Sequence, residues 1–136
     1  MNKSFDILSV HSFSLIGKEG TPKEVEHLWN EAENHIKEVN GHIIIDSFGP
    51  SYWGVNGDKS FFAGFEMKNI IKAPEGWSRK EIGGGEYLVH YPSDDEEFLD
   101  SLKIMKKEAD SLNRPLIGDP LDHAAEGLMA IYWLLG

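Results

Sequence analysis

The residues whose types and spacing best suit chemistry lie in the stretch 61–68, which alternates as a β-strand does. Because successive side chains of a strand point to opposite faces, Phe62, Gly64 and Glu66 share one face. An acidic group beside an aromatic ring and an open glycine suits an organic cation, since the ring and the carboxylate both attract positive charge. The opposite face is wholly apolar and is expected to pack against helices: Phe61, Ala63, Phe65 and Met67.

Other strand-like stretches add aromatic side chains that could line the same site. Trp53 lies in the stretch 52–55, Tyr87 in 86–91 and Tyr132 in 128–135. We expect these rings and Phe62 to supply the walls of a ligand site, with Glu66 as the partner of a charge. The alternative is ordinary core packing for the rings and a solvated Glu66.

Signatures of most other kinds of site are missing from the sequence. It has no Gly-x-Ser-x-Gly elbow, no phosphate-cradling Gly-Lys-Ser/Thr loop and no His-Glu-x-x-His. The run 83–85 is all glycine, but it precedes a strand and not a helix, so we read it as a bend. His27 and His35 could share a helix face, but two ligands without a third make a poor metal site. The chain has no cysteine, and we predict no metal and no cofactor.

The charge of the chain limits its partners. Its 136 residues carry a formal charge of −10, from 13 Lys and Arg against 23 Asp and Glu. Phosphate backbones and anionic lipids both need clustered positive side chains, so we expect no direct nucleic-acid partner and no membrane partner. The charge favours a cationic or neutral ligand, although it also serves solubility. The chain shows no signal-like or membrane-spanning apolar run, and we expect a cytoplasmic protein.

The sequence pattern repeats itself. Thr21–Glu24 and Ser93–Glu96 both match the capping box, a hydroxyl residue followed three positions on by Glu. The helices that should follow end at the breakers Asn40 and Asn113. The two starts lie 72 positions apart and the two breakers 73, a near-constant offset that indicates a duplication.

The predicted elements follow this repeat. We expect helices over 22–39 and 94–112, and strands over 6–16, broken near 9–11, and over 52–55, 61–71, 79–82, 86–91 and 128–135. The stretch 116–126 reads as an irregular segment rich in turn residues. Each helix has an apolar stripe: Val25, Leu28, Ala32, Ile36 and Val39 in the first, and Phe98, Leu102, Met105, Ala109 and Leu112 in the second.

The predicted fold class is α+β. A strand-strand-helix-strand-strand unit, duplicated with pseudo-twofold symmetry, would form an antiparallel sheet with two helices side by side on one face. We expect one domain over 1–136, with half-repeats at about 1–71 and 72–136. The seam between the halves is a natural place for a ligand cleft.

Four motifs, in this order and with the duplication, resemble the GyrI-like effector-binding domain. This is the ligand-sensing module at the end of many AraC-type and MerR-type bacterial transcription regulators, and it also occurs as a stand-alone protein. The motifs are the tyrosine-glycine strand at Tyr52–Val55, the Gly-x-Glu strand at Phe61–Met67, the glycine-then-tyrosine strand at Ile82–Val89 and the closing Ala130–Leu134.

The resemblance implies a fold of two pseudo-symmetric halves around a cleft that binds amphipathic, often cationic, compounds. Glu66 keeps the family's motif glutamate, whereas Ala130 stands where the closing motif usually has an acid. The central acid that many members use could be Asp119, Asp122 or absent. The helix at Pro22 already belongs to the first repeat, so this chain resembles a stand-alone member.

We therefore expect a stand-alone effector-binding protein that binds an aromatic or amphipathic compound, with cations among the candidates. The residues at the site would be Trp53, Phe62, Glu66, Tyr87 and Tyr132. We expect binding and not catalysis, but two alternatives stay open. One is a small-molecule hydrolase that uses Glu66 with Tyr132 or Tyr87. The other is a protein-interaction module that inhibits a DNA-acting partner through the acidic helix beginning at Asp94.

Overall fold

The computed structural model describes residues 4–34, 45–46, 49–50, 52–66, 75–125 and 128–136. The large sheet contains β1 (Phe5–Val10), β2 (Phe13–Gly20), β5 (Tyr52–Asn56), β6 (Phe61–Glu66), β7 (Ser78–Ile82), β8 (Gly85–His90), β9 (Leu116–Ala125) and β10 (Leu128–Leu135). The other elements are the 3-10 turn η1 (Pro22–Glu24), α1 (Val25–Asn34), α2 (Phe98–Ser111) and a small ladder of β3 (Ile45–Asp46) with β4 (Gly49–Pro50). The fold is α+β, as predicted.

The strand order of the large sheet is symmetric. It runs β1-β8-β10-β9-β5-β6-β2-β7, and all its ladders are antiparallel. If β1, β2, α1, β5 and β6 are matched with β7, β8, α2, β9 and β10, the order reads the same from either edge. The sheet therefore contains the predicted pseudo-twofold duplication. The first strand of each unit pairs with the second strand of the other, β1 with β8 and β7 with β2.

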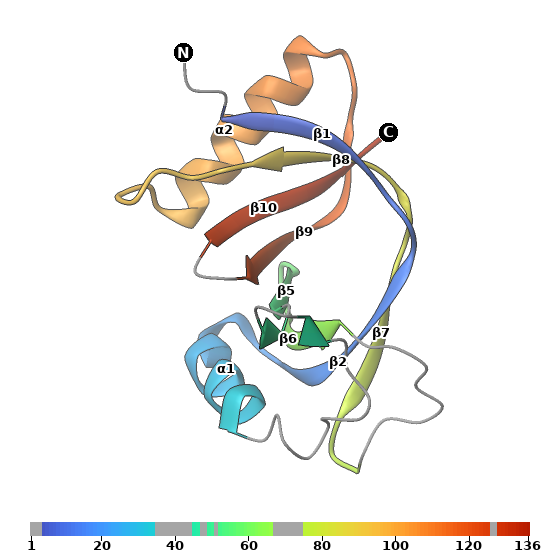
Figure 1. Ribbon diagram of the computed structural model, residues 1–136. Coiled ribbons are helices and arrows are strands. Elements are labelled where there is room, and N and C mark those ends of the chain that lie inside the picture. The colour runs from blue at the N-terminus through green and yellow to red at the C-terminus, as the bar shows by residue number, and fades with distance from the viewer. Residues whose placement is uncertain (1–3, 35–44, 47–48, 51, 67–74, 126–127) are drawn as a thin grey trace.

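Two long strand pairs bend together where the halves join. Figure 1 shows β1 passing into β2, and β7 into β8, at the right-hand side of the view. Phe5 lies opposite His90 before the bend, and Phe13 lies opposite Ile82 after it, so the pairing keeps one register. A Cβ on Gly84 would lie 2.8 Å from a backbone nitrogen of the facing strand connection. Glycine is needed for this close approach, and the predicted bend at 83–85 is confirmed.

Both helices cover the same face of the sheet, through the predicted apolar stripes. Leu28 of α1 is buried against Phe61 and Ala63 of β6. Met105 and Ala109 of α2 are buried in a second cluster, together with Leu88, Ile131, Trp133 and Leu135. Positions 32–39 of the first stripe lie outside the described side chains.

The helices do not lie side by side. Figure 1 shows α2 and α1 at opposite ends of the molecule, with the bent sheet between them. The other face of the sheet has a core of its own: Leu15, Trp53, Val55, Phe62, Ile82, Tyr87, Val89, Leu121 and Ala130. Both faces of the sheet are buried because it curves, and the face without helices becomes the inner face.

Two local predictions need correction. The stretch 116–126 was expected to be irregular, but Leu116–Ala125 is strand β9. Its ladder with β10 shifts register between Tyr132 and Leu134, and Gly118 there has φ 71°, so turn-type residues are accommodated by an irregularity within a strand. The second helix begins at Phe98 with Glu97 as N-cap, so the segment 93–96 is not its cap.

The first cap is confirmed. The backbone N–H of Thr21 donates to the Glu24 carboxylate at 2.9 Å, and the Thr21 hydroxyl donates to the same oxygen at 3.0 Å. Among the described residues, no helix is long and apolar enough to cross a membrane.

Candidate ligand-binding site

The alternation predicted for 61–66 is confirmed by the packing. Phe61 and Ala63 face α1, and Phe62 lies in the core of the inner face with Trp53. Glu66 is on the same face, because the indole N–H of Trp53 donates to its Oε1 at 3.0 Å. Sequence alternation therefore placed the acid on the correct side of the sheet.

A cavity of about 380 Å³ opens on this inner face beside Glu66. The carboxylate lies among three aromatic residues. The Trp53 ring centroid is 4.9 Å from that of Phe13 and 5.1 Å from that of Tyr132. The cavity is lined by Leu8, Ser9, Val10, His11, Ser12, Phe13, Trp53, Glu66 and Tyr132.

The electrostatics of the cavity are set by Glu66. Burial raises the pKa of the Tyr132 hydroxyl, and the negative charge of Glu66 raises it further. Tyr132 is thus a neutral phenol at physiological pH. The Trp53 N–H holds the Glu66 carboxylate in place, so the acid is positioned before any ligand arrives.

Three of the five predicted site residues meet at this cavity and two do not. Trp53, Glu66 and Tyr132 line it. Phe62 is only 2% exposed and belongs to the core beneath. Tyr87 lines a smaller cavity of about 230 Å³, and its hydroxyl donates to the Gly83 carbonyl at 2.6 Å. That hydrogen bond ties Tyr87 to the glycine bend.

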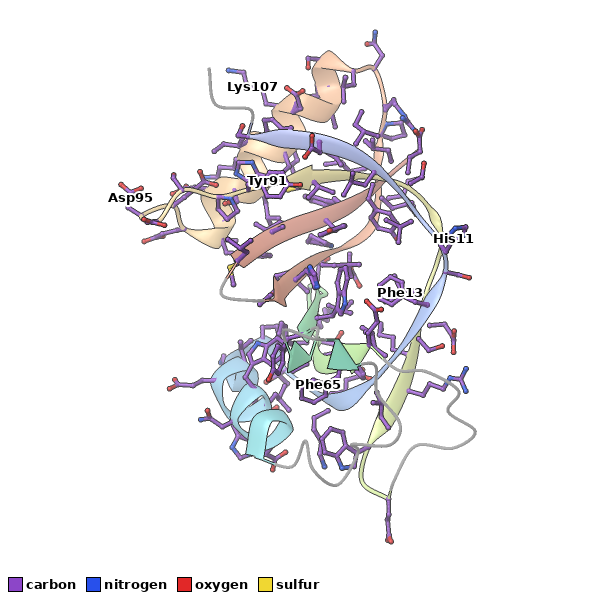
Figure 2. All side chains as sticks on the ribbon, viewed as in Figure 1. His11, Phe13, Phe65, Tyr91, Asp95 and Lys107 are labelled. Atoms are coloured by element: carbon purple, nitrogen blue, oxygen red, sulfur yellow. The ribbon has the colours of Figure 1, made fainter. Side chains whose placement is uncertain are left out.

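The sequence did not indicate Phe13, which lines the cavity, or His123, which packs against its wall. Phe13 comes from β2, just after the bend, and Figure 2 shows it on the side of the strand that faces the interior. Phe13 lies two positions before Leu15, which is fully buried, so strand alternation could have predicted that Phe13 faces the interior as well. His123 stacks on Trp53 with ring centroids 4.1 Å apart, and burial lowers its pKa. The sequence predicts an irregular segment over 116–126, so strand alternation could not predict which face His123 is on.

The two candidate central acids lie elsewhere. Asp119 lines the smaller cavity beside Tyr87. Asp122 lies on the helix side of the sheet, where Asn56 donates to its Oδ1 at 2.6 Å, and burial raises its pKa. Within the described ranges, no group of three or more His, Asp or Glu residues is placed to hold a metal ion.

Neither a protein-family model nor a curated protein matches the sequence. Solved structures match over nearly its whole length. The C-terminal domain of EcmrR superposes with a TM-score of 0.75 at 8% identity, covering 100% of this chain and 99% of that one. SAV2435 bound to tetraphenylphosphonium gives 0.66 at 10% identity, over 98% of this chain and 93% of that one. This chain has the same fold as these two proteins, the fold that the resemblance to the GyrI-like domain implied.

The same fold includes proteins of other descriptions. A hydrolase from Listeria innocua superposes with a TM-score of 0.58 at 9% identity, over 99% of this chain and 93% of that one. Fold alone therefore does not separate ligand sensing from catalysis, and the choice depends on the chemistry of the cavity.

Proposed function

We propose that this chain is an effector-binding protein whose ligand is an aromatic or amphipathic cation. The observation that carries the proposal is the Glu66 carboxylate, held by Trp53 in a cavity that Phe13 and Tyr132 also line. We further propose that residues 1–136 act as one cytoplasmic domain, with half-repeats at about 1–71 and 72–136.

The cavity suits a cation for two reasons. A carboxylate in a partly buried site attracts positive charge more strongly than one in bulk water. The faces of Trp53, Phe13 and Tyr132 add attraction of their own to a cation near the ring. The formal charge of −10 on the whole chain acts in the same direction at longer range.

The comparisons support the proposal by analogy. SAV2435 was solved with tetraphenylphosphonium, an aromatic cation, and EcmrR was solved in complex with DNA. At 8–10% identity these proteins share a fold with this chain, so the ligand class has to be tested on the chain itself.

The test compares a cation with a neutral molecule of similar shape. Tetraphenylphosphonium and triphenylphosphine oxide would be titrated by calorimetry into the wild type and into Glu66→Gln. We expect the variant to bind the cation more weakly by roughly 1 to 3 kcal/mol, because a charged contact is lost. Binding of the neutral oxide should change little, since Gln keeps the size of the side chain.

Glu26→Gln is the matched control. Glu26 is exposed on α1, so this variant makes the same change in net charge away from the cavity. Equal weakening of cation binding by both variants would mean that net charge and not the cavity attracts the ligand. No effect from either variant would exclude Glu66 as the partner of the cation.

Hydrolysis is the second candidate, because Glu66 and Tyr132 line the same cavity. A carboxylate and a phenol within one site can act as acid/base and orienting groups on a small substrate. The Glu66→Gln variant separates the two functions. If the protein is a hydrolase, this change abolishes turnover and leaves binding of a neutral substrate almost intact.

A further inference from the structure

A second and larger cavity adjoins the first on the inner face. It measures about 620 Å³ and shares Tyr132 with the first cavity. His123 lines the second cavity and stacks at 4.1 Å on Trp53, which lines the first. The two cavities therefore meet at Tyr132 and at the stacked rings of Trp53 and His123. The lining of the second cavity also includes Tyr91, Asp94, Glu96, Leu128 and Met129.

Three exposed apolar side chains line the second cavity. Leu128 is 75% exposed, Met129 55% and Tyr91 42%. Single exposed apolar residues are ordinary, but three around one cavity form a patch of the kind that a ligand or partner covers. Burial of such a patch is favourable for any apolar group of the right size.

The acids of the second cavity differ from Glu66. The Glu96 carboxylate already contacts His90 Nε2 at 2.5 Å and accepts a hydrogen bond from Ser101. Asp94 is exposed, and a solvated carboxylate attracts a cation only weakly. The charged end of a ligand is therefore better placed at Glu66, and the second cavity is better suited to an uncharged end.

We propose that the second cavity holds the apolar tail of an elongated cation whose charged head lies against Glu66. This inference rests on the proposed function and extends it to the shape of the ligand. Pockets that hold drug-sized molecules measure roughly 300–1,000 Å³. The first cavity, at about 380 Å³, has room for a head group and little more, so a longer ligand continues past Tyr132 into the second.

The test is a series of alkyltriphenylphosphonium ions with one head and chains from methyl to decyl, used below their micelle concentrations. Once the chain reaches the second cavity, each added methylene should tighten binding by up to about threefold to fourfold. In the double variant Leu128→Gln with Met129→Gln, the gain per methylene should fall below about half of the wild-type gain, because the apolar wall is removed. Affinity for the methyl compound should stay as in the wild type.

The matched control is the double variant Leu99→Gln with Ile104→Gln. These two residues of α2 are 69% and 38% exposed and line neither cavity. The control should keep the wild-type gain per methylene. The same gain in all three proteins would overturn the proposal, since the tail would then lie elsewhere.

A measurement on the wild type does not depend on whether the variants fold. With ¹³C-labelled methionine methyl groups, the decyl compound should shift the Met129 signal and the methyl compound should not. Met105, a fully buried residue of α2, is the internal reference. An unshifted Met129 signal at saturation would overturn the proposal.

The outcomes distinguish this inference from the function on which it rests. Suppose that Glu66→Gln weakens binding of the methyl compound, but that replacing Leu128 and Met129 leaves the gain in affinity per methylene unchanged. The tail site is then wrong and the cation site stands. If Glu66→Gln leaves every member of the series unchanged, the cation site fails and the tail proposal fails with it.

Discussion

At the scale of single residues, Asp122 is a carboxylate on the helix side of the sheet, at the ladder where the two halves meet. It lies opposite Gly54 of β5, and a Cβ on Gly54 would come within 2.5 Å of its Oδ1. The glycine leaves room for the carboxylate, and Asn56 supplies a hydrogen bond at 2.6 Å. Burial nevertheless raises the pKa of Asp122 above its ordinary value of 3.8, and the hydrogen bonds only partly offset this.

This raised pKa predicts how stability depends on pH. The folded chain holds the Asp122 proton more tightly than the unfolded chain does. Protonation of this group therefore stabilises the folded state fully below pH 3.8, and this contribution is lost as the pH rises through the pKa of the folded state. Asp122→Asn carries no titrating group. We expect the variant to gain unfolding free energy relative to the wild type as pH rises, by at most about 1.4 kcal/mol per pH unit within that window. Urea unfolding from pH 3.5 to 8 measures this difference.

Asp119→Asn is the control for that measurement. Asp119 is on the same strand but is exposed, and the variant should track the wild type across the pH range. A difference between Asp122→Asn and the wild type that stays constant with pH would show that burial does not govern this carboxylate.

At the scale of the elements, the two helices begin differently, although a capping-box pattern precedes each of them in the sequence. Thr21 precedes η1 and α1 and makes the capping-box contacts with Glu24. In the second repeat the Glu96 N–H donates to the Ser93 carbonyl at 2.9 Å, as the Glu24 N–H does to the Thr21 carbonyl, but the helix begins only at Phe98. The Glu96 carboxylate keeps a contact with Ser93 and also binds His90 and Ser101, so its side chain ties the loop to β8 and α2. A tertiary contact has overridden a local signal.

This contrast gives unequal expectations for the two hydroxyl residues. Thr21→Ala should destabilise the protein by about 1 kcal/mol, because a helix start loses its cap. Ser93→Ala should cost less than about half of that, since Ser93 lies outside the helix and its 3.3 Å contact with Glu96 is long. Thermal or chemical unfolding of both variants gives the two values. Equal losses at both sites would mean that Ser93 caps a helix after all.

At the scale of the whole molecule, the halves exchange their first strands. β1 belongs to the first repeat but pairs with β8 of the second, and β7 pairs in return with β2. The ladder between β5 and β9 joins the same two halves at the centre of the sheet. Each half therefore completes the sheet of the other.

This exchange predicts that neither half folds by itself. The fragments 1–71 and 72–136 would each lose a paired edge strand and expose the inner-face core, so neither should show cooperative unfolding. When mixed, they should recover a near-native circular dichroism spectrum and a cooperative melt. A cooperative melt of either fragment alone would show that the repeats are independent units.

Both helices and the face of Glu66 were predictable because each depends on local periodicity, and the duplication was predictable because the start and stop signals recur at a near-constant offset. Leu28 and Met105 lie on stripes with helical spacing, and Phe62 and Glu66 alternate as a strand requires. The strand β9 was not predictable in this way. Its Gly118 and Pro120 are turn residues by composition, and only pairing with β5 and β10 makes the segment extended.

The sequence by itself determined which side chains share a face, because that depends on neighbours two to four positions apart. It therefore identified Glu66, Trp53 and Tyr132 as candidates for one site. Only the tertiary structure decided which candidates meet. The bend of the sheet brings Phe13 to Trp53, leaves Phe62 in the core and turns Tyr87 to Gly83. Curvature depends on contacts between residues far apart in the chain, which local periodicity does not encode.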